Sequence, residues 1–261
     1  MNRKKFYYLI KLQFLGFRYS GWQKQPNRKT IEGMLTKTLK FILPEISFKI
    51  LGAGRTDAKV SALDAAFELF IEDTPLMNIE AFKNDFNKNL PSDIKIIDVS
   101  EVNESFNIIQ DGKIKKYVYL FSFGEKNHPF CAPYMTNIMD QLDIALMKEA
   151  ATLFMGTHNF QSYTARPREN AKMRRTIISS EIIENTFIEA NFFPKKSYAF
   201  IVEGSGFMRY QVRMMMGALL QLGKGEIPLD MITAALEEDN TVKFTYVAPG
   251  SGLHLHSLEF H

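Results

Sequence analysis

Apolar and polar residues in the first 105 positions follow two structural periods in turn. A two-residue alternation is typical of a strand with one buried face, and apolar residues three or four positions apart are typical of an amphipathic helix. The elements that these periods predict are, in chain order, strand 6–13, helix 30–42, strands 47–51 and 65–71, helix 78–88 and strand 94–100. Thr30 is expected to cap the first helix, with Glu32 in its first turn.

The rest of the chain repeats this order. The expected elements are strand 114–122, helix 142–154, strands 175–183 and 197–204, helix 207–222 and strand 253–259. Each half therefore has a split β-α-β pattern, as in ferredoxin-like domains. We predict an α+β protein with two halves, residues 1–105 and 106–261, joined into an extended mixed, mainly antiparallel sheet with helices on one side. A central cleft between the halves is expected to hold a large ligand.

One loop of the first half carries unusual chemistry. It reads Gly-Arg-Thr-Asp-Ala-Lys over residues 54–59 and lies between two predicted strands. Arg55 and Asp57 would each cost several kcal/mol if they were buried without a partner, so they are either exposed or paired. This loop, with one carboxylate and one fixed cation, is therefore the first candidate for a functional site. The alternative is an ordinary solvated hairpin end, because Gly and Asp are common turn residues. A phosphate-binding loop is a weaker third reading, since the sequence matches neither a dinucleotide fingerprint nor a P-loop.

The predicted helix 207–222 is apolar on almost every side but contains Arg213. An arginine stays charged in proteins, and a bidentate carboxylate is its best partner inside an apolar helix. Arg209 is expected one turn earlier on the same face. The alternative for Arg213 is that the long side chain reaches out to solvent.

The predicted strand 114–122 has one strongly aromatic face, formed by Lys115, Tyr117, Tyr119 and Phe121. Core packing explains most such faces. A tyrosine that faces a cleft, however, can stack on an extruded nucleobase and hydrogen-bond through its hydroxyl. Tyr117 is the better candidate for that role.

The overall composition indicates a globular protein without a membrane span. Of the 261 residues 46% are apolar, no apolar run approaches the roughly 18 residues of a membrane helix, and the N-terminus does not resemble a secretion signal. Cys131 is the only cysteine, which excludes an internal disulfide and suits a reducing compartment. His254 and His256 share a face of the last strand but lack a third metal ligand nearby, and a lone loop histidine such as His158 is usually structural.

The net charge of +3 is small, but the basic residues are clustered. The densest cluster lies between residues 166 and 175 and includes Arg166, Arg168, Lys172 and Arg174. Such a cluster suits a polyanion, because contacts of Lys and Arg with phosphates release counterions. The alternative is a merely solvated charged face.

Several segments, in order along the chain, resemble the bacterial tRNA pseudouridine synthase A family, also called tRNA pseudouridine synthase I. The segments are 14–25, 52–58, 87–94, 116–119, 175–177, 207–213 with Gly217, and 252–255. The chain departs from the family at three places. Lys59-Val60-Ser61-Ala62 stands where the family usually has Gly-Val-His-Ala, Leu15 replaces an acidic residue, and Phe106-Asn107 stands where a Phe-His-Ala-Arg stretch is common.

The resemblance implies a cytoplasmic isomerase that converts uridine to pseudouridine in the anticodon stem-loop of tRNA, at positions 38 to 40. It implies that Asp57 is the catalytic carboxylate, as a nucleophile or as a base at the ribose, and that Arg213 keeps it ionised and oriented. Further implied roles are stacking on the flipped uracil for Tyr117, bracing of the loop or RNA for Arg55, and lining of the pocket for Leu253. The RNA contacts expected on this reading are Arg166, Arg168, Lys172, Arg174 and Arg209.

No metal or organic cofactor is implied by the resemblance, and the partners would be tRNA and a second copy of the chain in a homodimer. Two alternatives remain because of the residues that follow Asp57. One is a catalytically silent RNA-binding module on the same scaffold, and the other is a pseudouridine synthase with a different RNA target.

Overall fold

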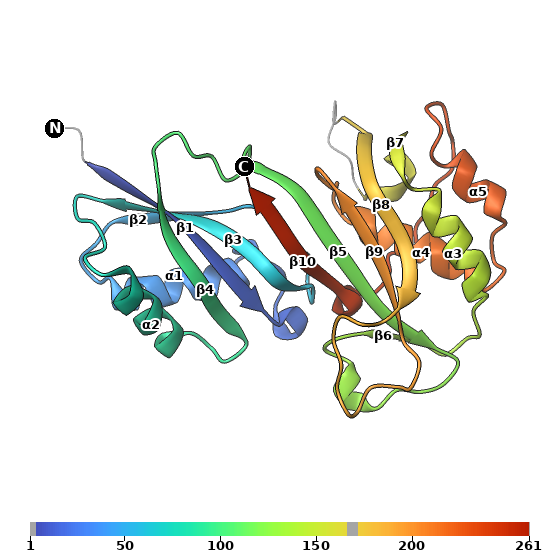
Figure 1. Ribbon diagram of the computed structural model, residues 1–261, viewed down its shortest axis with the longest axis horizontal. Helices are drawn as coiled ribbons and strands as arrows, with labels where there is room; N and C mark the ends of the chain where they lie inside the picture. Colours follow the sequence, from blue (N-terminus) through green and yellow to red (C-terminus); the bar gives the residue numbers. More distant parts are fainter. Residues whose placement is uncertain (1–3, 166–171, 261) are drawn as a thin grey trace. The chain divides into compact units, whose positions relative to one another are not determined.

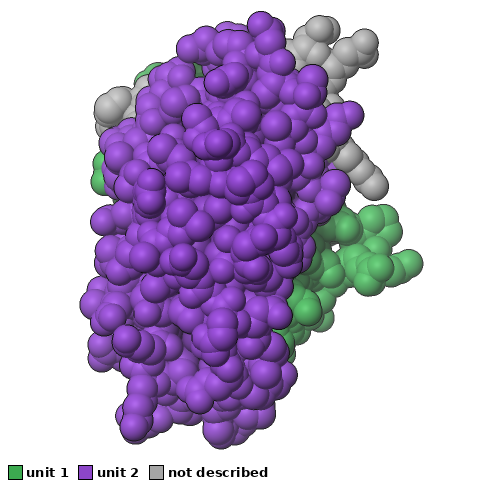
Figure 2. Space-filling model, turned by 90° about the vertical axis from the view of Figure 1, so that its right-hand side faces the viewer, with its two compact units in different colours: residues 1–113, 255–261 green, residues 114–254 purple. Residues whose placement is uncertain are grey.

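The computed structural model describes residues 4–165 and 172–260. The chain divides into two compact units, coloured separately in Figure 2. Unit 1 consists of residues 1–113 and 255–261, and unit 2 of residues 114–254. No helix in the described ranges reaches the length and apolar character that crossing a bilayer would require.

Unit 1 is an antiparallel sheet with two helices (Figure 1). Its elements are β1 (Lys5–Phe14), α1 (Ile31–Ile42), β2 (Phe48–Gly52), β3 (Ser61–Glu72), α2 (Ile79–Asn89), β4 (Ile94–Val102) and most of β10 (Leu253–Phe260). The strands lie in the order β4-β1-β3-β10, and β2 also pairs with β3. Helices α1 and α2 pack against each other, and α2 packs against β4.

The alternation in the sequence explains the core of unit 1. Tyr8, Ile10 and Leu12 of β1 are fully buried at every second position. Helix α1 buries its apolar stripe and begins after Thr30, whose hydroxyl accepts a hydrogen bond from the Gly33 N–H at 3.2 Å. The predicted cap is therefore confirmed.

Unit 2 also consists of mainly antiparallel strands and helices (Figure 1). Its elements are β5 (Gly112–Phe123), β6 (Thr136–Ile138), α3 (Ile144–Thr152), β7 (Gly156–Asn159), β8 (Arg174–Glu184), β9 (Tyr198–Gly204), α4 (Gln211–Gly223) and α5 (Leu229–Ala234). The strands lie in the order β5-β9-β8-β7, and the short β6 runs parallel to β5. Helix α3 packs against β8 and α4.

The α+β class and the mainly antiparallel pairing agree with the prediction. The predicted start of helix 207–222 is wrong, because α4 begins at Gln211. Tyr210 has φ +62°, a left-handed conformation that interrupts a right-handed helix. Arg209 consequently precedes the helix, and the prediction that it shares a helical face with Arg213 is also wrong.

Candidate active site

Asp57 lies in the loop between β2 and β3, residues 53–60, which we call the Asp57 loop. The Asp57 side chain is half-buried. The loop is bonded through its main chain to residues 15–22, which we call the clamp segment. The Trp22 N–H donates to the Thr56 carbonyl at 3.0 Å, and the Lys59 N–H donates to the Tyr19 carbonyl at 3.0 Å. These bonds lie on both sides of Asp57, so the loop is held more firmly than a solvated hairpin end.

Gly21 allows this close approach. Its φ is +94°, and a Cβ atom at this position would lie 2.7 Å from the Thr56 carbonyl oxygen. A residue with a side chain would therefore be strained by its backbone conformation and would also collide with the loop. The glycine of the clamp segment brings two stretches of backbone together beside Asp57.

The structure gives physical roles to two of the residues that depart from the family pattern. Ser61 is buried, and its hydroxyl accepts a hydrogen bond from the Gly16 N–H at 2.9 Å. Lys59 is exposed, has φ +66°, and places its Nζ atom 5.5 Å from the ring centroid of Phe17. Ser61 thus joins the start of β3, directly after the loop, to the clamp segment, whereas Lys59 adds a cation to the surface beside it.

Arg55 lies on the exposed part of the same loop. Its Nη1 atom donates to the Gln23 side-chain oxygen at 3.0 Å. This single bond to a neutral group leaves most of the guanidinium exposed to solvent. The position suits the expected brace, and its contact with RNA stays a prediction.

Tyr117 lies on β5 in unit 2, and its side chain is half-buried. Its ring meets Phe207 edge to face, with the centroids 5.1 Å apart and an angle of 86° between the planes. Tyr119, two residues further on, is fully buried, and its hydroxyl hydrogen-bonds to the Pro249 carbonyl at 2.8 Å and to Thr136 at 2.7 Å. Burial raises the pKa of Tyr119 well above its ordinary value. Tyr119 is therefore a core residue, and Tyr117 is the tyrosine of this pair with an accessible ring.

Arg213 lies in the first turn of α4 and is half-buried. Its Nε atom donates to the Ala248 carbonyl at 2.7 Å, and the Ala248 N–H donates to the Arg213 carbonyl at 3.1 Å. The guanidinium carbon of Arg213 lies 5.0 Å from the ring centroid of Tyr210, and that of Arg209 lies at the same distance. The orientation of Arg213 is thus fixed by a neighbouring backbone segment and by an aromatic ring.

Leu253 begins β10 and is 5% exposed. It belongs to unit 2 together with Tyr117 and Arg213, whereas Arg55 and Asp57 belong to unit 1. The expected ion pair between Asp57 and Arg213 and the expected pocket around Leu253 stay predictions.

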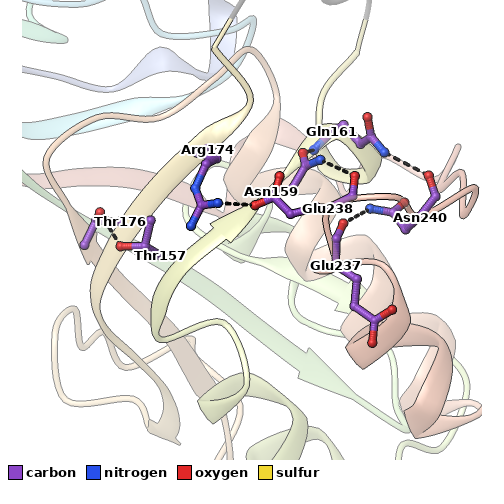
Figure 3. A network of polar contacts seen from close by, with 8 residues as sticks. All are labelled: Thr157, Asn159, Gln161, Arg174, Thr176, Glu237, Glu238 and Asn240. Atoms are coloured by element: carbon purple, nitrogen blue, oxygen red, sulfur yellow. Dashed lines mark hydrogen bonds and ion pairs between the residues drawn. The ribbon is translucent and has the colours of Figure 1, made fainter.

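The expected RNA contacts that the structure describes are exposed on unit 2. Lys172 precedes β8, Arg174 begins it, and Arg209 lies before α4. Arg174 forms an ion pair with Glu238 in the polar network of Figure 3. Arg166 and Arg168 lie outside the described residues.

The same network fixes the segment that carries Glu238. The Asn159 amide donates to the Glu238 carbonyl at 2.9 Å, and the Gln161 amide donates to the Asn240 carbonyl at 2.8 Å (Figure 3). The Asn240 amide in turn donates to the Glu237 carbonyl at 2.6 Å. Glu238 is therefore held beside Arg174 by its backbone and partly compensates the arginine's charge.

His254, His158 and Cys131 fit structural roles. His254 is buried, with its Nε2 atom 2.7 Å from the Tyr134 carbonyl oxygen, and the His158 Nε2 atom lies 2.7 Å from the Met155 carbonyl oxygen. Cys131 is part of a buried apolar cluster, and burial raises its thiol pKa. Within residues 4–165 and 172–260, the structure shows no group of three or more potential metal ligands.

Three residues around the site were not singled out by sequence reasoning: Tyr19, Asp93 and Tyr210. Tyr19 and Asp93 contact each other across 74 positions, and Tyr210 contacts both Arg209 and Arg213. All three lie within segments that carry the family resemblance, which was the available signal. The left-handed backbone of Tyr210 leaves no mark in the hydrophobic pattern.

Comparisons with known proteins agree with the resemblance along nearly the whole chain. The family model described as tRNA pseudouridine synthase matches residues 150–261. A tRNA pseudouridine synthase A from Thermodesulfovibrio yellowstonii is 32% identical over 252 residues, which cover 94% of this chain and 95% of the relative. A tRNA pseudouridine synthase A 2 from Bacillus cereus is 32% identical over 254 residues, 97% of this chain and 99% of the relative.

A tRNA pseudouridine synthase A from Streptococcus agalactiae is 32% identical over 248 residues, 95% of this chain and 93% of the relative. Both the degree of identity and the coverage are sufficient to assign the family. The chain belongs to the tRNA pseudouridine synthase A family, whose members are isomerases that convert uridine to pseudouridine.

Proposed function

We propose that this protein isomerises uridines in the anticodon stem-loop of tRNA, with Asp57 as its catalytic carboxylate. The observation that supports Asp57 most strongly is the fixation of its loop. Main-chain bonds from Trp22 and Lys59 hold both sides of a half-buried carboxylate, an arrangement that a simple turn does not need. A carboxylate held in this way can act on a bound substrate without first being ordered.

The reaction breaks the bond between uracil N1 and ribose C1′, turns the uracil, and joins its C5 to C1′. The hydrogen on C5 leaves as a proton and N1 gains one, so atoms and charge balance without a redox partner. Asp57 acts either as a nucleophile on the ribose or as a base that removes a proton from it. Both routes require that the Asp57 carboxylate is ionised and that the uracil is extruded from the stack of nucleobases.

Unit 2 supplies the supporting groups in this proposal. Arg213 is held by Ala248 and by the Tyr210 ring, and its permanent charge would lower the pKa of Asp57 and orient its carboxylate. Tyr117, fixed by Phe207, would stack on the extruded uracil. Leu253 would complete the apolar lining of the pocket.

The exposed basic residues Lys172, Arg174 and Arg209 would bind tRNA phosphates, and Arg55 would brace the loop or the RNA backbone. Following the family, we propose that two copies of the chain grip one tRNA in the cytoplasm. Size-exclusion chromatography with light scattering, with and without tRNA, tests the homodimer directly.

The role of Asp57 is tested with the Asp57→Ala variant and unmodified tRNA. We expect the single-turnover rate to fall below about a hundredth of the wild-type rate, with tRNA binding retained. Asp98→Asn is the matched control, because Asp98 is an exposed acid on β4. Normal turnover by Asp57→Ala, measured by mass spectrometry, would refute the assignment.

The target is tested by site-resolved pseudouridine mapping in a strain that lacks the gene. Loss of pseudouridine from the anticodon stem-loop supports the proposed target, and loss at another position or in another RNA supports the alternative target. Tight tRNA binding with no pseudouridine formed in any RNA would identify the silent binding module instead.

A further inference from the structure

The clamp segment is itself held by a carboxylate distant in sequence, Asp93. The Asp93 side chain is 13% exposed and lies in the turn before β4. Arg18 donates to both of its oxygens, with the Nη2 to Oδ1 bond at 2.9 Å. The Tyr19 hydroxyl donates to Oδ1 at 2.7 Å, and the Asp93 carbonyl accepts the Leu15 N–H at 2.9 Å.

These contacts keep Asp93 ionised and Tyr19 neutral. Burial would raise the pKa of the Asp93 carboxyl, but the hydrogen bonds from Arg18 and Tyr19 outweigh it and hold the pKa below its ordinary value. Burial, followed by the hydrogen bond to Asp93, raises the pKa of Tyr19 to about 12. A carboxylate can accept several donors at once, whereas an amide of the same shape would turn one acceptor into a donor.

The groups that Asp93 holds are neighbours of those that hold the Asp57 loop. The Tyr19 carbonyl accepts the Lys59 N–H, and the adjacent part of the clamp segment bonds to Thr56 through Trp22. At the other end of the clamp segment, the Gly16 N–H bonds to the Ser61 hydroxyl. A displacement of Tyr19 would therefore be transmitted to the backbone on either side of Asp57.

We propose that Asp93 is a positioning residue for the reaction, which sets the place of Asp57 through Arg18, Tyr19 and the clamp segment. The inference rests on the proposed catalytic role of Asp57. Asp93 itself touches neither the Asp57 loop nor, on this view, the substrate. Its charge stabilises the position of the clamp segment, and the clamp segment fixes the loop.

The chain carries its own reporter for this effect. Trp22 is the only tryptophan, is 4% exposed, and lies in the clamp segment with its ring against Gly52 and 6.1 Å from the ring centroid of Phe14. Its fluorescence therefore reports on the packing of the clamp segment against β1 and the end of β2, and the Trp22 backbone itself bonds to Thr56 of the Asp57 loop. A purely structural tether at Asp93 would change the stability of the protein but not this signal in the folded state.

The test compares Asp93→Asn and Tyr19→Phe with the control Asp98→Asn, at a temperature where circular dichroism shows every variant folded. For Asp93→Asn we expect the single-turnover rate to fall about tenfold to a hundredfold, because a displacement near 1 Å has effects of that size. The Kd for tRNA should stay within about threefold of wild type, and the Trp22 emission should shift or be quenched differently. Tyr19→Phe should show a smaller loss, and the double variant should lose no more than Asp93→Asn alone, since both act through one contact.

A normal rate and an unchanged Trp22 signal in folded Asp93→Asn would overturn the proposal. A lower single-turnover rate with unchanged Trp22 emission would also overturn it, because Asp93 would then affect the reaction without moving the clamp segment. Asp57→Ala, assayed in parallel, separates the two claims: an active Asp57→Ala protein removes the catalytic role of Asp57, whereas an inactive Asp57→Ala beside a fully active Asp93→Asn removes only the role of Asp93.

Discussion

Replacing Gly217 by alanine should damage catalysis without changing any polar side chain. A Cβ atom at this position of α4 would lie 2.2 Å from the Tyr246 carbonyl oxygen, so the chain around Tyr246 would have to move by about 1 Å. That chain continues to Ala248, whose backbone exchanges two hydrogen bonds with Arg213. Overpacking of this kind costs about 1–3 kcal/mol, and the better helix propensity of alanine returns about 1 kcal/mol. We expect the free energy of unfolding to fall by up to about 2 kcal/mol.

The single-turnover rate of Gly217→Ala should be affected more strongly than its free energy of unfolding. If Arg213 orients Asp57, a shift of its backbone partner should lower the single-turnover rate about tenfold to a hundredfold, measured on unmodified tRNA with the folded fraction checked by circular dichroism. Gly223→Ala is the matched control in the last turn of the same helix. Its Cβ would meet the buried Met147 side chain, with the sulfur at 2.5 Å and Cγ at 2.9 Å, so this variant also overpacks α4 but against a side chain rather than against the backbone that leads to Ala248. A wild-type rate for Gly217→Ala, together with a higher free energy of unfolding, would refute the reasoning.

Four other predictions concern stability, pH and charge. Because Lys59 has φ +66°, Lys59→Gly should be about 1 kcal/mol more stable to urea than Lys59→Ala, and equal stabilities would contradict the strain. The pKa of Asp93 is lower in the folded protein than in the unfolded chain, so its ionised carboxylate stabilises the fold at pH values above the ordinary aspartate pKa. This contribution to the free energy of unfolding is lost as the pH falls through the folded-state pKa. Urea titrations below about pH 4 should show the loss in wild type and not in Asp93→Asn. Thr30→Ala should lower the free energy of unfolding by about 1 kcal/mol, and an unchanged midpoint in urea would argue against the cap. Glu238→Gln should release Arg174 and tighten tRNA binding about threefold at low salt, a gain that Arg174→Ala should abolish.

The helices and strands could be predicted from the sequence wherever one face of the element is buried and the other is not. The alternation over Tyr8, Ile10 and Leu12 indicated a strand because burial is decided position by position along it. The start of α4 did not follow, because residues 207–210 are as helix-like in composition as those after them. The helix begins only after Tyr210, because the tertiary structure holds the backbone of this residue in a left-handed conformation.

The sequence singled out the charged residues of the candidate site but not the contacts that hold them in place. Asp57 stood out as a lone carboxylate in a glycine-rich turn, and Arg213 stood out as a cation within an apolar run. The sequence could not show that Arg213 bonds to the backbone of Ala248, or that Asp93 holds Arg18 and Tyr19. These contacts join positions 35 to 75 residues apart, and neither hydrophobic period nor turn propensity carries information over such separations.

The surroundings of Asp57 and of Arg213 share one construction. Beside Asp57, Gly21 would collide with the Thr56 carbonyl if it had a side chain, and beside Arg213, Gly217 would collide with the Tyr246 carbonyl in the same way. In each unit a charged residue is thus held where two stretches of backbone meet over a glycine. Backbone contacts have less conformational freedom than contacts between long side chains, so they fix a charged group with a smaller loss of entropy. It follows that alanine at Gly21 or Gly217 should disturb the reaction as strongly as the loss of a neighbouring polar side chain, although neither glycine has a side chain that could take part in it.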